Sequence, residues 1–275
     1  MLAELSEDAA QGPVAEIYGE IRRLWAVPYV SSLQRHLATR PGWLEWAWAA
    51  LGPAFLSGQA QTAGWRVAAD LDLPKLQPLT TAALRNLGVA TADEKVIAEV
   101  CAGFVRVAPV NLMFSGLLRR LLNGERPAGP SPGPSPAAVA WQPPKVLPAL
   151  PRLVDIAAAD ADLRAVLLQL GTGVDGTPFV PGLYLILARW PAYIAHLGGM
   201  LAPLGAAPET AAARAALLAG IDGAVAELFP TLPALSEQEM PAPDEFPAVL
   251  AALDMYRRTS PEMVIFGRLI AGALG

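Results

Sequence analysis

Few residues of this sequence have side chains suited to chemistry, and their types narrow the choice of reaction. There is one cysteine, Cys101, and there are two histidines, His36 and His196. A single cysteine forms no internal disulfide, and this set cannot supply the Cys and His ligands of a zinc site. The sequence therefore predicts no metal centre and no redox pair, and we expect no cofactor.

Two polar residues draw attention because of the segments that contain them. Asn111 lies in APVNLMF and Asp175 lies in GTGVDGTPF. The Asn111 amide could point into a pocket, or it could cap a helix that begins just after it. Asp175 precedes glycine, which is typical of a turn, but its carboxylate could also accept a proton.

The elements that would position these residues are predicted to be helices. Apolar residues recur at three- and four-residue spacings in PGWLEWAWAALGPAF, which we expect to end at Gly52-Pro53, and in TADEKVIAEVCAGFVRVA, where Cys101 falls on the apolar face. ETAAARAALLAGIDGAVAEL is rich in alanine. Alternating patterns typical of strands are missing, so the sequence predicts an all-α fold.

Aromatic residues are concentrated in the first part of the chain, at Trp25, Tyr29, Trp43, Trp46 and Trp48. At helical spacing such residues are more often core than pocket lining. We also expect His36 on a helix face near solvent and His196 in the core.

The chain contains a repeat. VPYVSSLQRHLATRP (27–41) and TPFVPGLYLILARWP (177–191) match at an offset of 150 residues, and Pro53 aligns with Pro203. Nearer the end, Pro109 aligns with Pro261 at an offset of 152. Between the copies, nine of the 27 prolines fall in residues 127–151. We therefore predict a first helical repeat (1–124), a Pro-rich linker (125–151) and a second repeat (152–275), which form a pseudo-dimer with a site at their seam.

Composition limits the partners. Hydrophobic residues make up 53% and charged residues 16%, with a net charge of -5 and no basic stripe. Nucleic acid is therefore excluded as a predicted partner. No uninterrupted apolar run reaches the ~18 residues of a membrane span, and the acidic start does not resemble a secretory signal. We expect a cytoplasmic protein without a membrane partner, and we leave a homodimer open.

The motifs VPYV (27–30), the tryptophan-rich helix, APVNL (108–112) and ILARWP (186–191), in this order and duplicated, resemble the group I 2-haloacid dehalogenases. These enzymes hydrolyse both D- and L-2-halocarboxylic acids. The resemblance spans both halves outside the linker. It implies an all-helical pseudo-dimer that is related in shape to the alkylhydroperoxidase D-like fold. It also implies a small carboxylic acid as the ligand.

In the family, an aspartate of the second repeat activates a water that displaces halide directly, and an asparagine of the first repeat helps to orient that chemistry. The asparagine matches Asn111. At the expected place of the aspartate stands Leu183, with Gly182 in place of serine. Leucine cannot accept a proton, and a positioned base contributes ~10²–10⁴-fold to a rate.

Three alternatives follow: an enzyme in which Asp175 or another acid replaces the lost base, a protein that binds the acid without turnover, and a non-catalytic helical binding or interaction module. For the first two, Asp175 is the candidate base, and the expected substrate-binding residues are Tyr29, Ser32, Asn111, Gly182, Leu183, Tyr184 and Tyr256.

Overall fold

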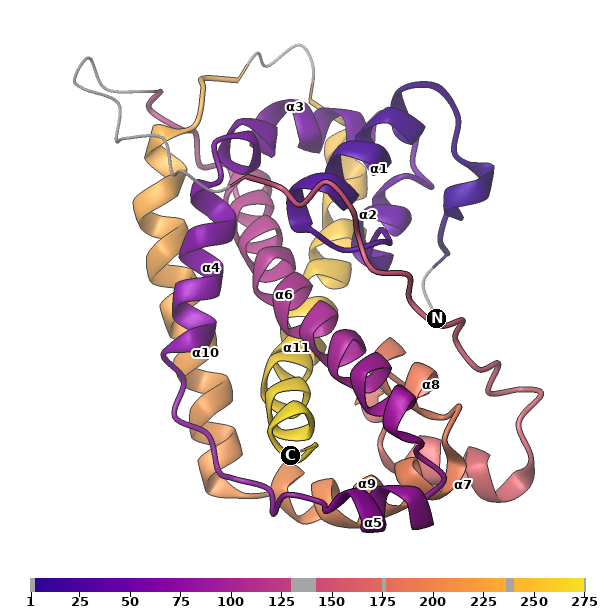
Figure 1. Ribbon diagram of the computed structural model, residues 1–275. Coiled ribbons are helices and arrows are strands. Elements are labelled where there is room, and N and C mark those ends of the chain that lie inside the picture. The colour runs from indigo at the N-terminus through magenta and orange to yellow at the C-terminus, as the bar shows by residue number, and fades with distance from the viewer. Residues whose placement is uncertain (1–2, 130–141, 175–176, 236–239, 275) are drawn as a thin grey trace. The chain divides into compact units, whose positions relative to one another are not determined.

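Helices account for nearly all regular structure in the computed structural model of the chain (Figure 1). The structure describes residues 3–129, 142–174, 177–235 and 240–274. The helices are α1 (Gly12–Trp25), α2 (Ser32–Leu37), α3 (Trp43–Leu56), α4 (Gln59–Ala69), α5 (Thr81–Asn86), α6 (Thr91–Leu122), α7 (Ala161–Gln169), α8 (Gly182–Leu187), α9 (Pro191–Gly205), α10 (Pro208–Leu228) and α11 (Phe246–Gly272). The predicted all-α class is confirmed.

One short hairpin interrupts the helices of the described chain. Strand β1 (Thr172–Val174) pairs with β2 (Thr177–Phe179) in antiparallel register, so that Thr172 lies opposite Phe179. Asp175, the predicted substitute base, lies outside the described residues. Its role stays a prediction.

The chain divides into two compact units. Unit 1 comprises Met1–Asp70, Arg106–Leu147 and Leu217–Ser260, and unit 2 comprises Leu71–Val105, Pro148–Ala216 and Pro261–Gly275. Each unit therefore takes segments from both predicted repeats.

Aromatic rings form the core of unit 1. Trp25 lies with its ring centroid 5.8 Å from that of Phe55 and 6.1 Å from that of Phe114, and Trp48 stacks on Phe55 at 6.1 Å. Trp25 and Trp43 are fully buried, as expected for core aromatics. Such edge and tilted pairs stabilise a core beyond the apolar area that they bury.

Small residues allow close helix contacts in unit 1. A Cβ added at Gly64 of α4 would lie 3.1 Å from the Pro109 carbonyl oxygen of α6, and one at Gly220 of α10 would lie 2.5 Å from Val67. The contact of Gly220 with Val67 places the Leu217–Leu228 part of α10 beside α4, as Figure 1 also shows.

Unit 2 packs α7 and α8 against α9. Its fully buried side chains include Leu183, Tyr193 and Ile194. Gly267 of α11 approaches Val105 of α6, since an added Cβ would lie 2.8 Å from its side chain.

Proline does not end the long helices. We predicted that the tryptophan-rich helix ends at Gly52-Pro53, but α3 continues to Leu56. Proline lacks a backbone N–H, so Pro53 removes one hydrogen bond from the helix. The loss is small because Pro53 lies near the end of α3, and the Pro53 carbonyl still accepts a hydrogen bond from the Ser57 N–H. Pro203, Pro109 and Pro261 also lie inside helices.

The helix bounds follow the sequence offset. Helix α8 spans the residues that lie 150 positions after α2, and the paired prolines fall inside α3 and α9 or inside α6 and α11. The predicted first repeat contributes residues 71–105 to unit 2, and the predicted second repeat contributes residues 217–260 to unit 1. These two segments nearly correspond to each other when one is shifted by about 150 residues. The repeat boundaries themselves stay a prediction.

Among the described helices, α6 alone is long and apolar enough to cross a membrane by length and composition. Most of its apolar stretch is buried within the protein, as in the core helix of a globular fold.

Candidate functional site

Asn111 lies in the middle of α6, in unit 1, and is 7% exposed. Its Oδ1 accepts a hydrogen bond from Gln34 Nε2 at 3.3 Å, and its Nδ2 donates to Ser31 Oγ at 2.8 Å. The helix-cap interpretation is wrong, because α6 begins at Thr91 and runs through Pro109 to Leu122. The Asn111 amide instead joins α6 to the start of α2.

This cluster has hydrogen-bonding capacity that the described protein atoms do not use. Gln34 is fully buried, and its Oε1 has no hydrogen-bond partner among the described residues. Ser115, one helical turn after Asn111, is also fully buried, and its Oγ is without a described partner. Leaving buried polar atoms unpaired costs about 1–3 kcal/mol each, so unpaired atoms beside a fixed amide are typical of a place where a polar ligand binds.

Three other predicted site residues belong to unit 1. The Tyr256 hydroxyl shares a hydrogen bond with the Ser32 side chain. Burial raises the pKa values of both Tyr256 and Tyr29, so both phenols remain neutral at physiological pH. They can donate or accept a hydrogen bond but cannot serve as an ionised base.

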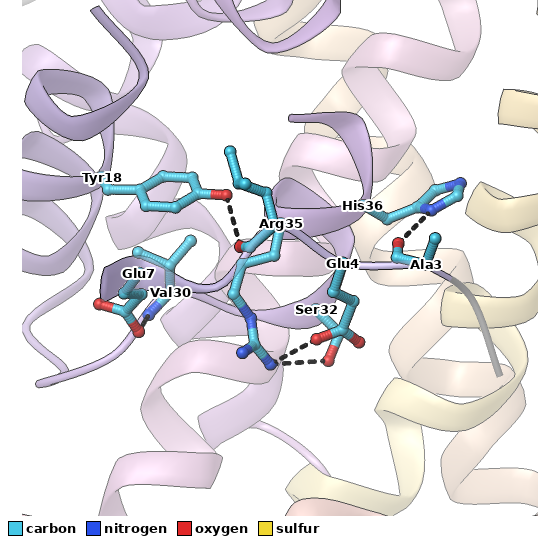
Figure 2. A network of polar contacts seen from close by, with 9 residues as sticks. Ala3, Glu4, Glu7, Tyr18, Val30, Ser32, Arg35 and His36 are labelled. Atoms are coloured by element: carbon cyan, nitrogen blue, oxygen red, sulfur yellow. Dashed lines mark hydrogen bonds and ion pairs between the residues drawn. The ribbon is translucent and has the colours of Figure 1, made fainter. Parts of the chain in front are cut away.

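Helix α2, which carries Gln34, is bound to the N-terminal segment by hydrogen bonds and an ion pair (Figure 2). The Leu5 N–H donates to the Arg35 carbonyl at 3.0 Å, and the Arg35 guanidinium pairs with Glu4 at 2.7 Å. Tyr18 donates to the Leu5 carbonyl at 3.1 Å. These contacts fix the register of α2 and hence the position of Gln34.

Both histidine predictions were wrong. His36 is 4% exposed, and its Nδ1 lies 2.8 Å from the Ala3 carbonyl oxygen, because the N-terminal segment covers the face that we expected to meet solvent (Figure 2). His196 lies on the exposed face of α9. Neither is part of the Asn111 cluster.

The other predicted site residues, Gly182 to Tyr184, begin α8 in unit 2. Leu183 is fully buried and Tyr184 is 1% exposed. A Cβ added at Gly182 would lie 3.3 Å from the Phe104 ring, so glycine here permits a tight contact. The position at which the resemblance implies an aspartate is therefore an apolar core position in this chain.

A carboxylate that the sequence reasoning missed lies elsewhere in unit 2. Glu262 of α11 is 8% exposed; its Oε1 accepts from Arg214 Nη2 at 2.7 Å and its Oε2 accepts from Thr172 Oγ1 at 2.7 Å. The pKa of Tyr184 is raised by burial first and by the Glu262 charge second, while Arg214 opposes the shift. One feature of the sequence could have indicated that Glu262 is buried: it is the only charged residue in the run PEMVIF, which is otherwise apolar.

The remaining candidates for chemistry have structural roles. Cys101 is fully buried, as its place on the apolar face predicted, and burial raises the pKa of its thiol to about 12. Within the described ranges, no group of three or more His, Cys, Asp or Glu side chains is placed to hold a metal ion.

No family model matches the sequence, and no curated protein matches it significantly. Solved structures do match. They include a D-2-haloacid dehalogenase mutant and a complex of such a mutant with D-2-CPA, both with a TM-score of 0.78, and a complex of D-2-haloacid dehalogenase with L-LA, with a TM-score of 0.77. Each is 19% identical, and the match covers 100% of this chain and 96–97% of the other. The chain thus has a haloacid dehalogenase-like fold over its whole length.

Proposed function

We propose that this protein binds a small, largely apolar carboxylic acid of the 2-haloacid type, with Asn111 as the polar residue that recognises it. The buried Asn111 cluster of unit 1 carries the proposal. The Asn111 side-chain amide is hydrogen-bonded through both its oxygen and its nitrogen. Gln34 Oε1 and Ser115 Oγ have no hydrogen-bond partner among the described residues. The fold it shares with D-2-haloacid dehalogenases supports this class of ligand.

The polar groups of the Asn111 cluster are suited to binding more than to proton abstraction. Amides and neutral hydroxyls donate and accept hydrogen bonds without changing charge at neutral pH. Because hydrogen bonds already hold the side chains of Ser31, Gln34 and Asn111 in place, these side chains lose little conformational entropy when a ligand binds. Leu33 and Leu37, which share helix α2 with Gln34, are fully buried and apolar, and such neighbours favour a ligand with a short apolar body.

The resemblance to group I enzymes extends the proposal to both enantiomers of the acid. It does not extend to the family's own base, since Leu183 has no proton acceptor. Hydrolysis by this protein needs a carboxylate from another position.

Isothermal titration calorimetry with D- and L-2-chloropropionate tests the proposed function. We expect both acids to bind and Asn111→Ala to weaken binding at least about tenfold, the equivalent of roughly 1.4 kcal/mol. Asn123→Ala is the matched control, because Asn123 is exposed near the end of the same long helical segment. If the wild-type protein binds neither acid, the non-catalytic interaction module becomes the better description.

A further inference from the structure

Gln34 gives the Asn111 cluster a buried acceptor that no described atom uses. Asn111 directs its Nδ2 to Ser31 Oγ at 2.8 Å, so that its Oδ1 faces Gln34 and accepts from Gln34 Nε2 at 3.3 Å. Gln34 therefore turns its Oε1 away from Asn111, and this buried oxygen has no hydrogen-bond partner within the described ranges. A carbonyl oxygen only accepts hydrogen bonds, so a ligand that satisfies it must bring an N–H or O–H donor.

Ser115 adds a hydroxyl to the same stretch of α6. It follows Asn111 by one helical turn and therefore lies on the same face of the helix. Its side chain is fully buried, and its Oγ meets no hydrogen-bond partner in the part of the chain that the structure describes. A hydroxyl donates as well as accepts. The two unpaired atoms thus differ in kind, because Gln34 Oε1 needs a donor and Ser115 Oγ can supply one.

The carboxylate of the proposed ligand satisfies only one of these two atoms. An ionised carboxylate accepts hydrogen bonds, so it can pair with Ser115, but it has no proton to offer to Gln34 Oε1. A halogen on carbon 2 of the acid brings no N–H or O–H either. A 2-halo acid would therefore leave Gln34 Oε1 buried and unpaired, which costs free energy. A hydroxyl on carbon 2 supplies the missing donor.

An amino group on carbon 2 fits the cluster less well than a hydroxyl. At neutral pH it is an ammonium group, and burying such a charge is costly unless an opposite charge pairs with it. The side chains of the cluster, Ser31, Gln34, Asn111 and Ser115, are amides and hydroxyls, so none of them is a carboxylate. A neutral hydroxyl provides the donor without that cost.

From these observations, and resting on the proposed function, we propose that the Asn111 cluster selects 2-hydroxy acids over 2-halo acids, and that Gln34 is the residue that sets this preference. The hydroxyl on carbon 2 of the acid donates to Gln34 Oε1, and the Ser115 hydroxyl donates to the carboxylate. The ligand binds as the hydroxy acid itself. No covalent bond forms or breaks, so binding needs no proton acceptor elsewhere in the chain.

The test compares the binding of D- and L-lactate with that of D- and L-2-chloropropionate by calorimetry, because lactate and 2-chloropropionate differ only in the group on carbon 2. We expect lactate to bind wild type at least about tenfold more tightly than 2-chloropropionate of the same configuration. Gln34→Leu removes the acceptor and should bring the two affinities within about threefold of each other. Ser115→Ala is the matched control from the same cluster: it should weaken both acids by a similar factor and keep the preference, since both carry the carboxylate.

Should Gln34→Leu fail to fold, as judged by circular dichroism, Gln34→Met takes its place, because methionine keeps an unbranched side chain of similar length without the amide. Two results overturn the inference and leave the proposed function standing: wild type binds 2-chloropropionate as tightly as lactate or more tightly, or a folded Gln34 variant keeps the wild-type preference for lactate. If wild type binds none of these acids, the inference and the proposed function both fall.

Discussion

Asn111 and Glu262 are buried polar side chains, and each is held by two hydrogen bonds from or to other side chains. Asn111 could be singled out in advance, because a polar residue in an apolar segment and the family resemblance both pointed to it. Glu262 could not, because its burial and its two partners, Arg214 and Thr172, come from segments 48 and 90 residues away. Leu183 shows the reverse: its sequence position implied a site residue, and the structure places it in the core.

The buried thiol and phenols predict how stability depends on alkaline pH. Burial raises the pKa of Cys101 from 9.0 to about 12 and that of Tyr18 from 10.0 to about 12. The unfolded chain ionises these groups first, so their contribution to stability is full below about pH 9 and is lost as the pH rises through 9 to 12. We expect the urea midpoint to fall steadily above about pH 9. Cys101→Ala should flatten the part of this fall between about pH 9 and 10, and an unchanged slope there would contradict the assignment.

At the scale of elements, helix identity was predictable and helix ends were less so. Apolar spacing identified the long helices, but Pro53 did not end α3 as predicted. The reason is that proline costs a helix one hydrogen bond locally, while the packing of a whole apolar face is decided by the helices around it. The β1–β2 hairpin was missed for a related reason, since three-residue strands carry too short an alternation to recognise.

Two glycines of α10 test the close helix contact in unit 1. Gly220→Ala should lower the free energy of unfolding by about 1–3 kcal/mol, because the new methyl would overlap Val67. Gly223→Ala, three residues later on the same helix, meets nothing within 4 Å and should raise stability by up to ~1 kcal/mol through helix propensity. Chemical denaturation measures both. Equal effects of the two substitutions would show that α4 and α10 do not approach as described.

At the scale of the whole molecule, the compact units cut across the predicted repeats. Unit 1 requires 217–260 from the second repeat, and unit 2 requires 71–105 from the first. Each unit therefore has a core to which segments of both predicted repeats belong.

Fragments 1–124 and 152–275 therefore should not fold independently. Expressed separately, each is expected to lack cooperative unfolding, and the two co-expressed should assemble into a species with the helix content of the intact chain. Circular dichroism and size-exclusion chromatography measure this. A cooperative unfolding transition of 1–124 alone would contradict the exchange of segments.

Reading the sequence alone was enough to predict the all-α class, the aromatic core and the haloacid dehalogenase-like fold, and it singled out Asn111 as a candidate site residue. These depend on local periodicity, composition and an ordered set of short motifs, which a chain carries whether or not it is folded. The folded structure was needed to show that His36 is buried under the N-terminal segment, that Asn111 connects α6 to α2 from the middle of a helix, and that Glu262 is a buried carboxylate paired with Arg214. The burial of a side chain, its hydrogen-bond partners and the division of the chain into units all depend on residues that are far apart in the sequence. A local sequence pattern cannot predict these features, because each is set by the residues that the folded chain packs around the position.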